Sequence, residues 1–425
     1  MGFKEVDGYS WLVGFFLVLL SVLLFGVFGF SCQDFCISSV GSVVWGVFCF
    51  DFVGCYLVLL SVLLWLSLLF FCGWVSRVSL FWIGVSVFFS VLSYVCVHAL
   101  WFWVFYELSI LPLLLLLVLE SPYSERYVAS WYLLGYVVLT SLPMLLCFYY
   151  ISSEIGSFSI CLWGSEGLGV GVFFVLGVMF ITKIPLPPFH VWLPIVHAEA
   201  TSAVSVCLSG YIMKLGILGV VRFGTRFLSD YIFSSLYMLV VLGVSVLFFF
   251  SASRELDGKR WLAFLSLSHI LIASLCLCVV GFDGSGLSLL YCLGHGFSAG
   301  VTFVLLWVVY EVSGSRNWGV LKYGLSSSLL VRCLCGACLC TVASLPPTVQ
   351  FFCEVFVVSE AGFVSVLFFF VLFLYLFFGG LVPVFLLGGL LSRHYNIGFG
   401  GGKIFGALGS VLLLLVWGFG LFLVG

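Results

Sequence analysis

Two hydrophobic stretches of this chain are each interrupted by a pair of prolines, and each carries an ionisable residue near the break. Lys183 stands before Pro187-Pro188, and Glu354 follows Pro346-Pro347. Proline removes a backbone donor and clashes with the preceding turn, so a helix should break at each pair. A broken helix persists at membrane depth only where it is buried in protein or lines a wet cavity. A matched pair of such breaks is typical of transporters built from inverted repeats.

The composition is that of an integral membrane protein. Of the 425 residues, 64% are hydrophobic and 8% are charged, whereas a soluble domain has about 25% charged residues. The apolar runs are continuous over about 20 residues, which suits spanning helices and not the alternating strands of a barrel. We therefore expect an all-α polytopic membrane protein, with a first run at 9–30 that stays in the bilayer. The net charge of -2 gives no reason to expect a nucleic-acid partner.

The apolar runs predict about 13 transmembrane helices. Their ranges are 9–30, 52–72, 79–98, 100–119, 127–150, 168–196, 200–222, 231–252, 260–280, 286–310, 327–358, 363–391 and 404–424. With this count, eleven of the lysines and arginines fall on one side, while only Arg222 and Arg226 fall on the other. The positive-inside rule then places the N-terminus and the even-numbered loops inside and the C-terminus outside.

The breaks fall in the sixth and eleventh segments, which are five segments apart. Because five is odd, a five-helix repeat would place its second copy inverted in the membrane. This spacing predicts N-terminal helices at 1–99, a first repeat at 100–252 and a second repeat at 260–425.

Several ionisable residues lie inside the predicted segments, where a charge costs about 2.5–3.5 kcal/mol on insertion scales. They are Glu107, Lys183, Lys214, His269, His295 and Glu354. Buried lysines and carboxylates shift their proton affinity when a partner moves, and histidine titrates near neutral pH. The row is therefore a candidate proton path parallel to the membrane, in which Glu107 should pair with Lys183. The alternative is a set of static ion pairs that hold helices together.

Metal and haem sites are weaker interpretations of the same chain. The spacing of Cys333, Cys335, Cys338 and Cys340 resembles a metal cluster, but no histidine or carboxylate supports it. The six histidines form no repeated pair of the kind that ligates haem. His190, His197 and Glu199 either cluster at the mouth of the first break or are ordinary interfacial residues. We expect no cofactor in this chain.

From about residue 100 to 390 the chain resembles the antiporter-like subunits of respiratory complex I, most closely the mitochondrial subunit 4 branch. The resemblance rests on motifs in the family's order: Phe105-Tyr106-Glu107 with Leu111-Pro112, Thr182-Lys183-Ile184-Pro185, His197-Ala198-Glu199, Met213-Lys214, Ser268-His269, His295-Gly296, and Leu345-Pro346-Pro347-Thr348 to Glu354. The chain departs from the family at Ile195, Thr201 and Cys353, and it is shorter near the N-terminus. These departures leave the ionisable row intact.

The resemblance implies a proton-translocating subunit of the membrane arm of NADH:ubiquinone oxidoreductase, driven by redox chemistry elsewhere in the complex. It implies the mitochondrial inner membrane, with the N-terminus in the matrix and Gly425 in the intermembrane space. The partners would be other membrane-arm subunits and lipids, with no direct NADH binding. A stand-alone cation/proton antiporter subunit of the same fold and a purely structural membrane scaffold are the alternatives. Phe, Val, Gly and Cys are abundant, whereas Gln and Asn occur twice each, which suggests a strand-biased organelle genome. This bias argues against the stand-alone antiporter subunit.

Overall fold

The structure is a computed structural model, and it describes residues 43–71, 74–163, 170–224, 234–279, 284–325, 329–392 and 403–424. A short hairpin of β1 (Val43–Trp45) and β2 (Phe48–Phe50) precedes the helices. The helices are α2 (Phe52–Leu69), α3 (Arg77–Val95), α4 (Ala99–Glu120), α5 (Arg126–Leu133), α6 (Ser141–Ile155), α7 (Val170–Lys183), α8 (Trp192–Glu199), α9 (Ser202–Cys207), α10 (Met213–Gly224), α12 (Ser235–Arg254), α13 (Gly258–Val279), α14 (Gly284–Ser313), α15 (Trp318–Leu325), α16 (Leu329–Val342), α17 (Val349–Val364), α18 (Val366–Leu391) and α19 (Lys403–Val424). The π-helical turns η3 (Leu134–Val138) and η5 (Leu208–Ile212) join α5 to α6 and α9 to α10, and a 3-10 turn η4 spans Ile160–Leu162.

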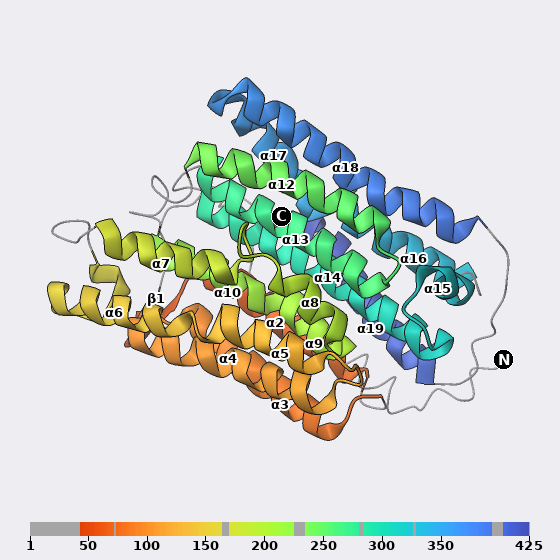
Figure 1. The fold of residues 1–425 in the computed structure, drawn as a ribbon, viewed down its shortest axis with the longest axis horizontal. Coiled ribbons are helices and arrows are strands. Elements are labelled where there is room, and N and C mark those ends of the chain that lie inside the picture. The colour runs from red at the N-terminus through yellow and green to blue at the C-terminus, as the bar shows by residue number, and fades with distance from the viewer. Residues whose placement is uncertain are drawn as a thin grey trace.

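Most helices run side by side along the long axis of the molecule, with the earlier helices below and the later ones above in Figure 1. Within the described ranges, eight helical stretches are long and apolar enough to cross a membrane, and four shorter apolar helices accompany them. The expectation of an all-helical membrane protein is therefore confirmed. The predicted total of 13 spans stays a prediction, because the 9–30 segment lies outside the described residues.

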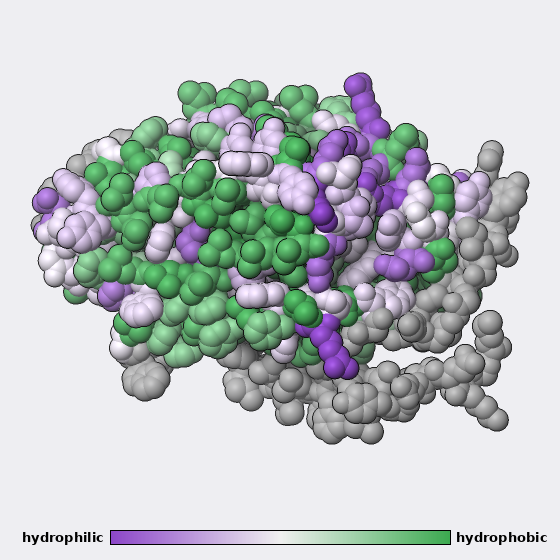
Figure 2. All heavy atoms as spheres, turned by 60° about the horizontal axis from the view of Figure 1, so that its bottom comes forward, coloured by the Kyte–Doolittle hydropathy of each residue, from purple (hydrophilic) through white to green (hydrophobic). Residues whose placement is uncertain are grey.

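The centre of the bundle is formed by helices that have almost no free surface. In an apolar 18-residue stretch of Ser202–Phe223 every residue is buried, and in one of Ser285–Ser313 94% of the residues are, whereas in one of Val366–Leu391 only 22% are. Phe385 and Val366 on that outer helix are 81% and 85% exposed. Figure 2 brings the side of α3, α4 and α5 forward and shows a broad hydrophobic face with hydrophilic side chains gathered toward one end. Lys214, His269 and His295 of the candidate path are carried by α10, α13 and α14, the helices with the least free surface.

Loops gather at both ends of the bundle. At one end, Arg316 donates to the carbonyl of Ala198 and lies 4.1 Å over the ring of Tyr123, and Lys259 Nζ donates to the carbonyl of Ala200 at 2.9 Å. The loops after α4, α8, α12 and α14 therefore meet there. Burial of the Tyr123 phenol in this loop cluster raises its pKa.

At the opposite end, an ion pair ties the start of α2 to the end of α10. Arg222 Nη2 donates to Asp51 Oδ1 at 2.8 Å and to the carbonyl of Tyr94 at 3.0 Å, and Nη1 pairs with Asp51 Oδ2. Asp51 also caps α2, because its Oδ1 accepts from the Gly54 amide at 2.9 Å. One carboxylate therefore both starts a helix and joins it to a neighbour.

Both proline-broken segments are pairs of short helices, as predicted. The first consists of α7, which ends at Lys183, and α8, which begins at Trp192. Backbone carbonyls of this break accept from side chains: Trp192 Nε1 donates to Thr182 O at 3.1 Å, and Tyr237 donates to Pro187 O at 2.7 Å. The second consists of α16, which ends at Val342, and α17, which begins at Val349.

Candidate functional site

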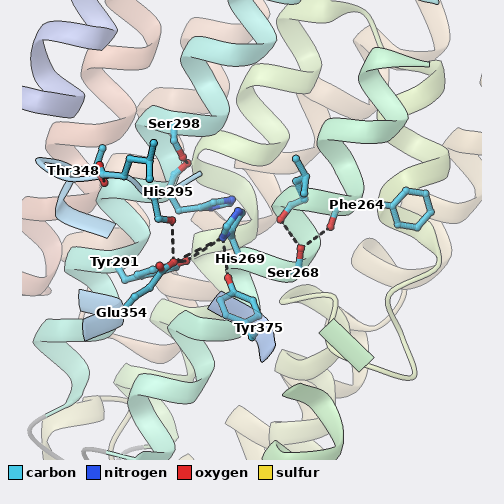
Figure 3. A network of polar contacts seen from close by, with 12 residues as sticks. Phe264, Ser268, His269, Tyr291, His295, Ser298, Thr348, Glu354 and Tyr375 are labelled. Atoms are coloured by element: carbon cyan, nitrogen blue, oxygen red, sulfur yellow. Dashed lines mark hydrogen bonds and ion pairs between the residues drawn. The ribbon is translucent and has the colours of Figure 1, made fainter. Parts of the chain in front are cut away.

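The second helix break brings Glu354 into a cluster of buried hydroxyl and imidazole groups (Figure 3). Ser344, in the break itself, and Tyr291 of α14 each donate to Glu354 Oε1 at 3.0 Å. Ser344 holds a φ of 51°, a left-handed conformation that non-glycine residues adopt infrequently. The break therefore positions a hydroxyl that a regular helix would have placed elsewhere.

His269 of α13 is the next member of this cluster. Its Nδ1 lies 2.8 Å from the hydroxyl of Tyr375, 3.4 Å from that of Tyr291 and 4.0 Å from Glu354 Oε1. Tyr375 comes from α18, Tyr291 from α14 and Glu354 from α17, so three helices converge on the imidazole that α13 carries. All these side chains are almost completely buried.

The cluster continues through His295 to Lys214. The imidazole rings of His269 and His295 have centroids 6.0 Å apart. His295 Nδ1 in turn lies 3.0 Å from Lys214 Nζ, which also donates to the carbonyl of Ser209 in η5. Lys214 is completely buried. Four of the six predicted residues thus form one line of neighbouring polar groups: Lys214, His295, His269 and Glu354.

The other two predicted residues lie together at the first break. Glu107 and Lys183 interact electrostatically, but the ion pairs within 4.0 Å in the described part of the chain do not include them. Lys183 Nζ instead donates to the carbonyl of Val137 at 2.8 Å and lies 4.4 Å above the ring of Tyr106. The Val137 carbonyl belongs to the π-helical turn η3, so local backbone irregularity supplies this lysine with its acceptor.

Close packing joins the two groups. A Cβ added at Gly216 in α10 would lie 2.8 Å from Ile184 Cγ1 and 3.2 Å from the Lys183 carbonyl carbon. Only glycine allows α10 to approach the end of α7 this closely. The absence of a side chain two residues after Lys214 therefore brings the segment that carries Lys214 against the one that carries Lys183.

The sequence interpretation missed the hydroxyl groups that connect the ionisable ones. Tyr291 stands four residues before His295, so the two share one face of α14. Tyr375 is the one residue with a polar side chain between Val366 and Phe378. Both signals were present in the sequence. The contact between Ser344 and Glu354 depends on the backbone conformation of the break, so it could not be predicted from the sequence.

The remaining candidates from the sequence stand apart from this line. His197 is completely buried and stacks on Phe303, with centroids 5.1 Å apart, and neither of its ring nitrogens has a hydrogen-bond partner within the described residues. Glu199 is buried at the end of α8, and His190 packs against Phe248. Over the described ranges, no group of three or more His, Cys, Asp or Glu side chains is placed to hold a metal.

The arrangement suits proton transfer more than bond-breaking chemistry. Lysine, imidazole, phenol and carboxyl groups each bind and release a proton, and neighbours at hydrogen-bond distance can pass one along. Because these groups are buried, they do not exchange protons directly with bulk water along such a path.

Comparison with known proteins places the chain in a family. The profile described as "NADH:quinone oxidoreductase/Mrp antiporter, TM" matches residues 96–380. A relative named NADH-ubiquinone oxidoreductase chain 4 from Caenorhabditis elegans is 26% identical over 304 residues, covering 70% of this chain and 73% of the relative. The protein of the same name from Locusta migratoria is 32% identical over 219 residues, covering 51% of this chain and 49% of the relative.

Solved structures share the fold. A chain of respiratory complex I from Thermus thermophilus with bound NADH aligns with a TM-score of 0.77 and 21% identity, covering 96% of this chain and 95% of that one. A chain of the Mrp complex from Dietzia sp. DQ12-45-1b aligns with a TM-score of 0.74 and 18% identity, covering 92% of this chain and 76% of that one. At these identities the likeness is one of fold.

Proposed function

Since the chain belongs to the NADH:quinone oxidoreductase/Mrp antiporter transmembrane family, we propose that it is a proton-translocating subunit in the membrane arm of NADH:ubiquinone oxidoreductase. The curated relatives carry the name of chain 4 of that enzyme. The chain contributes to the enzyme as a subunit, and the redox chemistry takes place elsewhere in the complex. Other subunits of complex I are its partners.

The observation that carries the proposal is the line of buried polar neighbours from Lys214 to Glu354, in which His295 and His269 are ring neighbours 6.0 Å apart without a direct hydrogen bond. Lys214 lies 3.0 Å from His295, and His269 lies 2.8 Å from Tyr375 and 4.0 Å from Glu354. In this mechanism, a proton released by Lys214 is taken up by His295 and passed to His269. The buried tyrosine hydroxyls then relay it to the carboxylate of Glu354. Glu107 and Lys183 form a second, coupled pair at the other break, whose charge state biases Lys214.

The two breaks support the proposed inverted repeats. One copy would comprise the helices from α4 to α12, and the other those from α13 to α19. Four spans separate the two broken segments: Ser202–Phe223, Ser235–Arg254, Gly258–Val279 and Ser285–Ser313. The broken segments would therefore cross the membrane in opposite directions. The location we propose is the mitochondrial inner membrane, as a multi-pass subunit. The N-terminus would face the matrix and the C-terminus the intermembrane space, in keeping with the lysine- and arginine-rich loops that gather at one end of the bundle.

Neutral variants at the two ends of the line test this function. Lys214→Met and Glu354→Gln should each lower the protons pumped per NADH oxidised by the intact complex in sealed vesicles. The amount of assembled complex should stay near that of the wild type. Lys322→Met is the matched control, because Lys322 Nζ bonds Ser392 Oγ at 3.2 Å and the backbone of Gly389 near the end of α18, away from the line. Normal pumping by both neutral variants would favour static helix pairing instead.

A stand-alone antiporter subunit is the second candidate, favoured by the fold shared with the Mrp complex chain. The two functions separate in one purification. A complex I subunit copurifies with NADH:quinone reductase activity, whereas a subunit of a stand-alone antiporter does not.

A further inference from the structure

A small cavity lies beside the second helix break, between α14, the α16–α17 junction and α19. Its volume is about 10 Å³, and its polar lining comes from Ser298, Thr341, Thr348 and Gln350. These four side chains are buried. Figure 3 shows Ser298 and Thr348 next to His295, on the side of the network away from Tyr375. The cavity therefore adjoins the line of ionisable groups without belonging to it.

Gln350 is the residue in this cavity whose hydrogen bonding is incomplete. Its side chain is 1% exposed, and neither Oε1 nor Nε2 has a hydrogen-bond partner among the described residues. Close packing holds the side chain in place, because a Cβ added at Gly294 would lie 3.0 Å from Gln350 Cγ. Buried amides are normally hydrogen-bonded, to protein or to ordered water. The side chain cannot turn away to find bulk solvent.

The three hydroxyl groups around the cavity already donate their hydrogen bonds to backbone carbonyls. Ser298 Oγ donates to His295 O at 3.1 Å, Thr341 Oγ1 to Cys338 O at 2.7 Å, and Thr348 Oγ1 to Leu345 O at 2.9 Å. Each hydroxyl oxygen therefore offers only lone pairs to the cavity. Gln350 Nε2 supplies the donors that the hydroxyls lack. The set calls for a ligand that both accepts and donates hydrogen bonds.

We propose that Gln350 and these hydroxyls bind one ordered water molecule. Water accepts a hydrogen bond from Gln350 Nε2 and donates to a hydroxyl oxygen and to Gln350 Oε1. A buried water needs two to four polar partners and about 10–15 Å³ of space, and the cavity meets both conditions. A hard cation fits less well, because the amide hydrogens repel it and no carboxylate lines the cavity. The water ties α14 to the break and is a site separate from the proposed proton path.

A density map of the intact complex, at a resolution that shows ordered waters, tests the proposal directly. The wild type should show one peak about 2.7–3.2 Å from a Gln350 amide atom and from at least one of the hydroxyl oxygens. The peak should be lost in Gln350→Leu, which has a similar shape but no polar atoms. A wild-type cavity without the peak would overturn the proposal. So would a peak whose height depends on sodium concentration, because that would mark a cation.

A matched pair of threonine variants separates the water from general packing. Thr341→Val removes a hydroxyl that lines the cavity, and Thr302→Val removes one that also bonds its own helix, to Ser298 O at 2.8 Å, but does not line it. The peak should weaken or shift in Thr341→Val and stay unchanged in Thr302→Val. Equal effects of the two changes would refute the assignment. None of these outcomes depends on whether the chain pumps protons, so the water site and the proposed function can fail separately.

Discussion

Replacing Tyr375 by phenylalanine should slow proton movement through this chain while leaving the fold intact. The tyrosine hydroxyl lies 2.8 Å from His269 Nδ1, and the ring is buried among α12, α13 and α18. Phenylalanine keeps the ring and removes only the oxygen. The change therefore removes one hydroxyl of the proposed path, which contacts His269 and also Tyr291.

The size of the expected effect follows from the hydrogen-bonding neighbours that His269 retains after the substitution. A buried hydrogen bond contributes about 1 kcal/mol net, and an unsatisfied partner costs about 1–3 kcal/mol. His269 Nδ1 retains Tyr291 as a neighbour at 3.4 Å, so the lower end of this range applies. About 1 kcal/mol on the barrier corresponds to a roughly fivefold slower transfer step. Proton pumping per NADH should fall, or turnover should drop about fivefold if this step is rate-limiting.

Tyr211→Phe is the matched control for this experiment. Tyr211 is as deeply buried, and its hydroxyl contacts Ser86 Oγ at 2.9 Å and the side chain of Cys207, neither of which belongs to the proposed path. The assay compares pH changes outside sealed vesicles with NADH consumption, for both variants and the wild type. If Tyr375→Phe pumps and turns over like Tyr211→Phe, the relay through Tyr375 is refuted.

Two further predictions concern stability. Asp51→Asn keeps an oxygen to cap α2 but removes the charge that pairs with Arg222. The free energy of unfolding of the subunit should fall by about 1.5–3 kcal/mol, measured as a lower thermal midpoint. An unchanged midpoint would mean that the ion pair contributes nothing to stability. Gly219→Ala would place a Cβ 2.1 Å from Cε1 of Phe180, whose ring is buried between α7 and α10. The resulting overpacking costs about 1–3 kcal/mol and should lower the yield of assembled complex. Gly243→Ala, whose Cβ meets nothing within 4 Å, should assemble normally, and equal yields for both alanines would contradict the packing argument.

The sequence alone determined the class of the protein, the places where its helices break and the four ionisable residues of the polar line. Long apolar runs require spanning helices, since a backbone in lipid must satisfy its own hydrogen bonds. Proline pairs dictate breaks by local sterics, and the structure has both of them. Lys214 and Glu354 stood out because a charge inside an apolar run is costly wherever the run packs.

Which of these residues touch was decided only by the tertiary structure. Glu107 and Lys183 stood out as a pair in the sequence, and the structure adds that Lys183 donates to the Val137 carbonyl of the π-helical turn. Tyr375 comes from α18, more than a hundred residues after His269, and Ser344 reaches Glu354 through a left-handed backbone turn. Periodicity and composition describe one helix at a time. Contacts between helices depend on how closely their backbones approach, which residues such as Gly216 set only once both partners are in place.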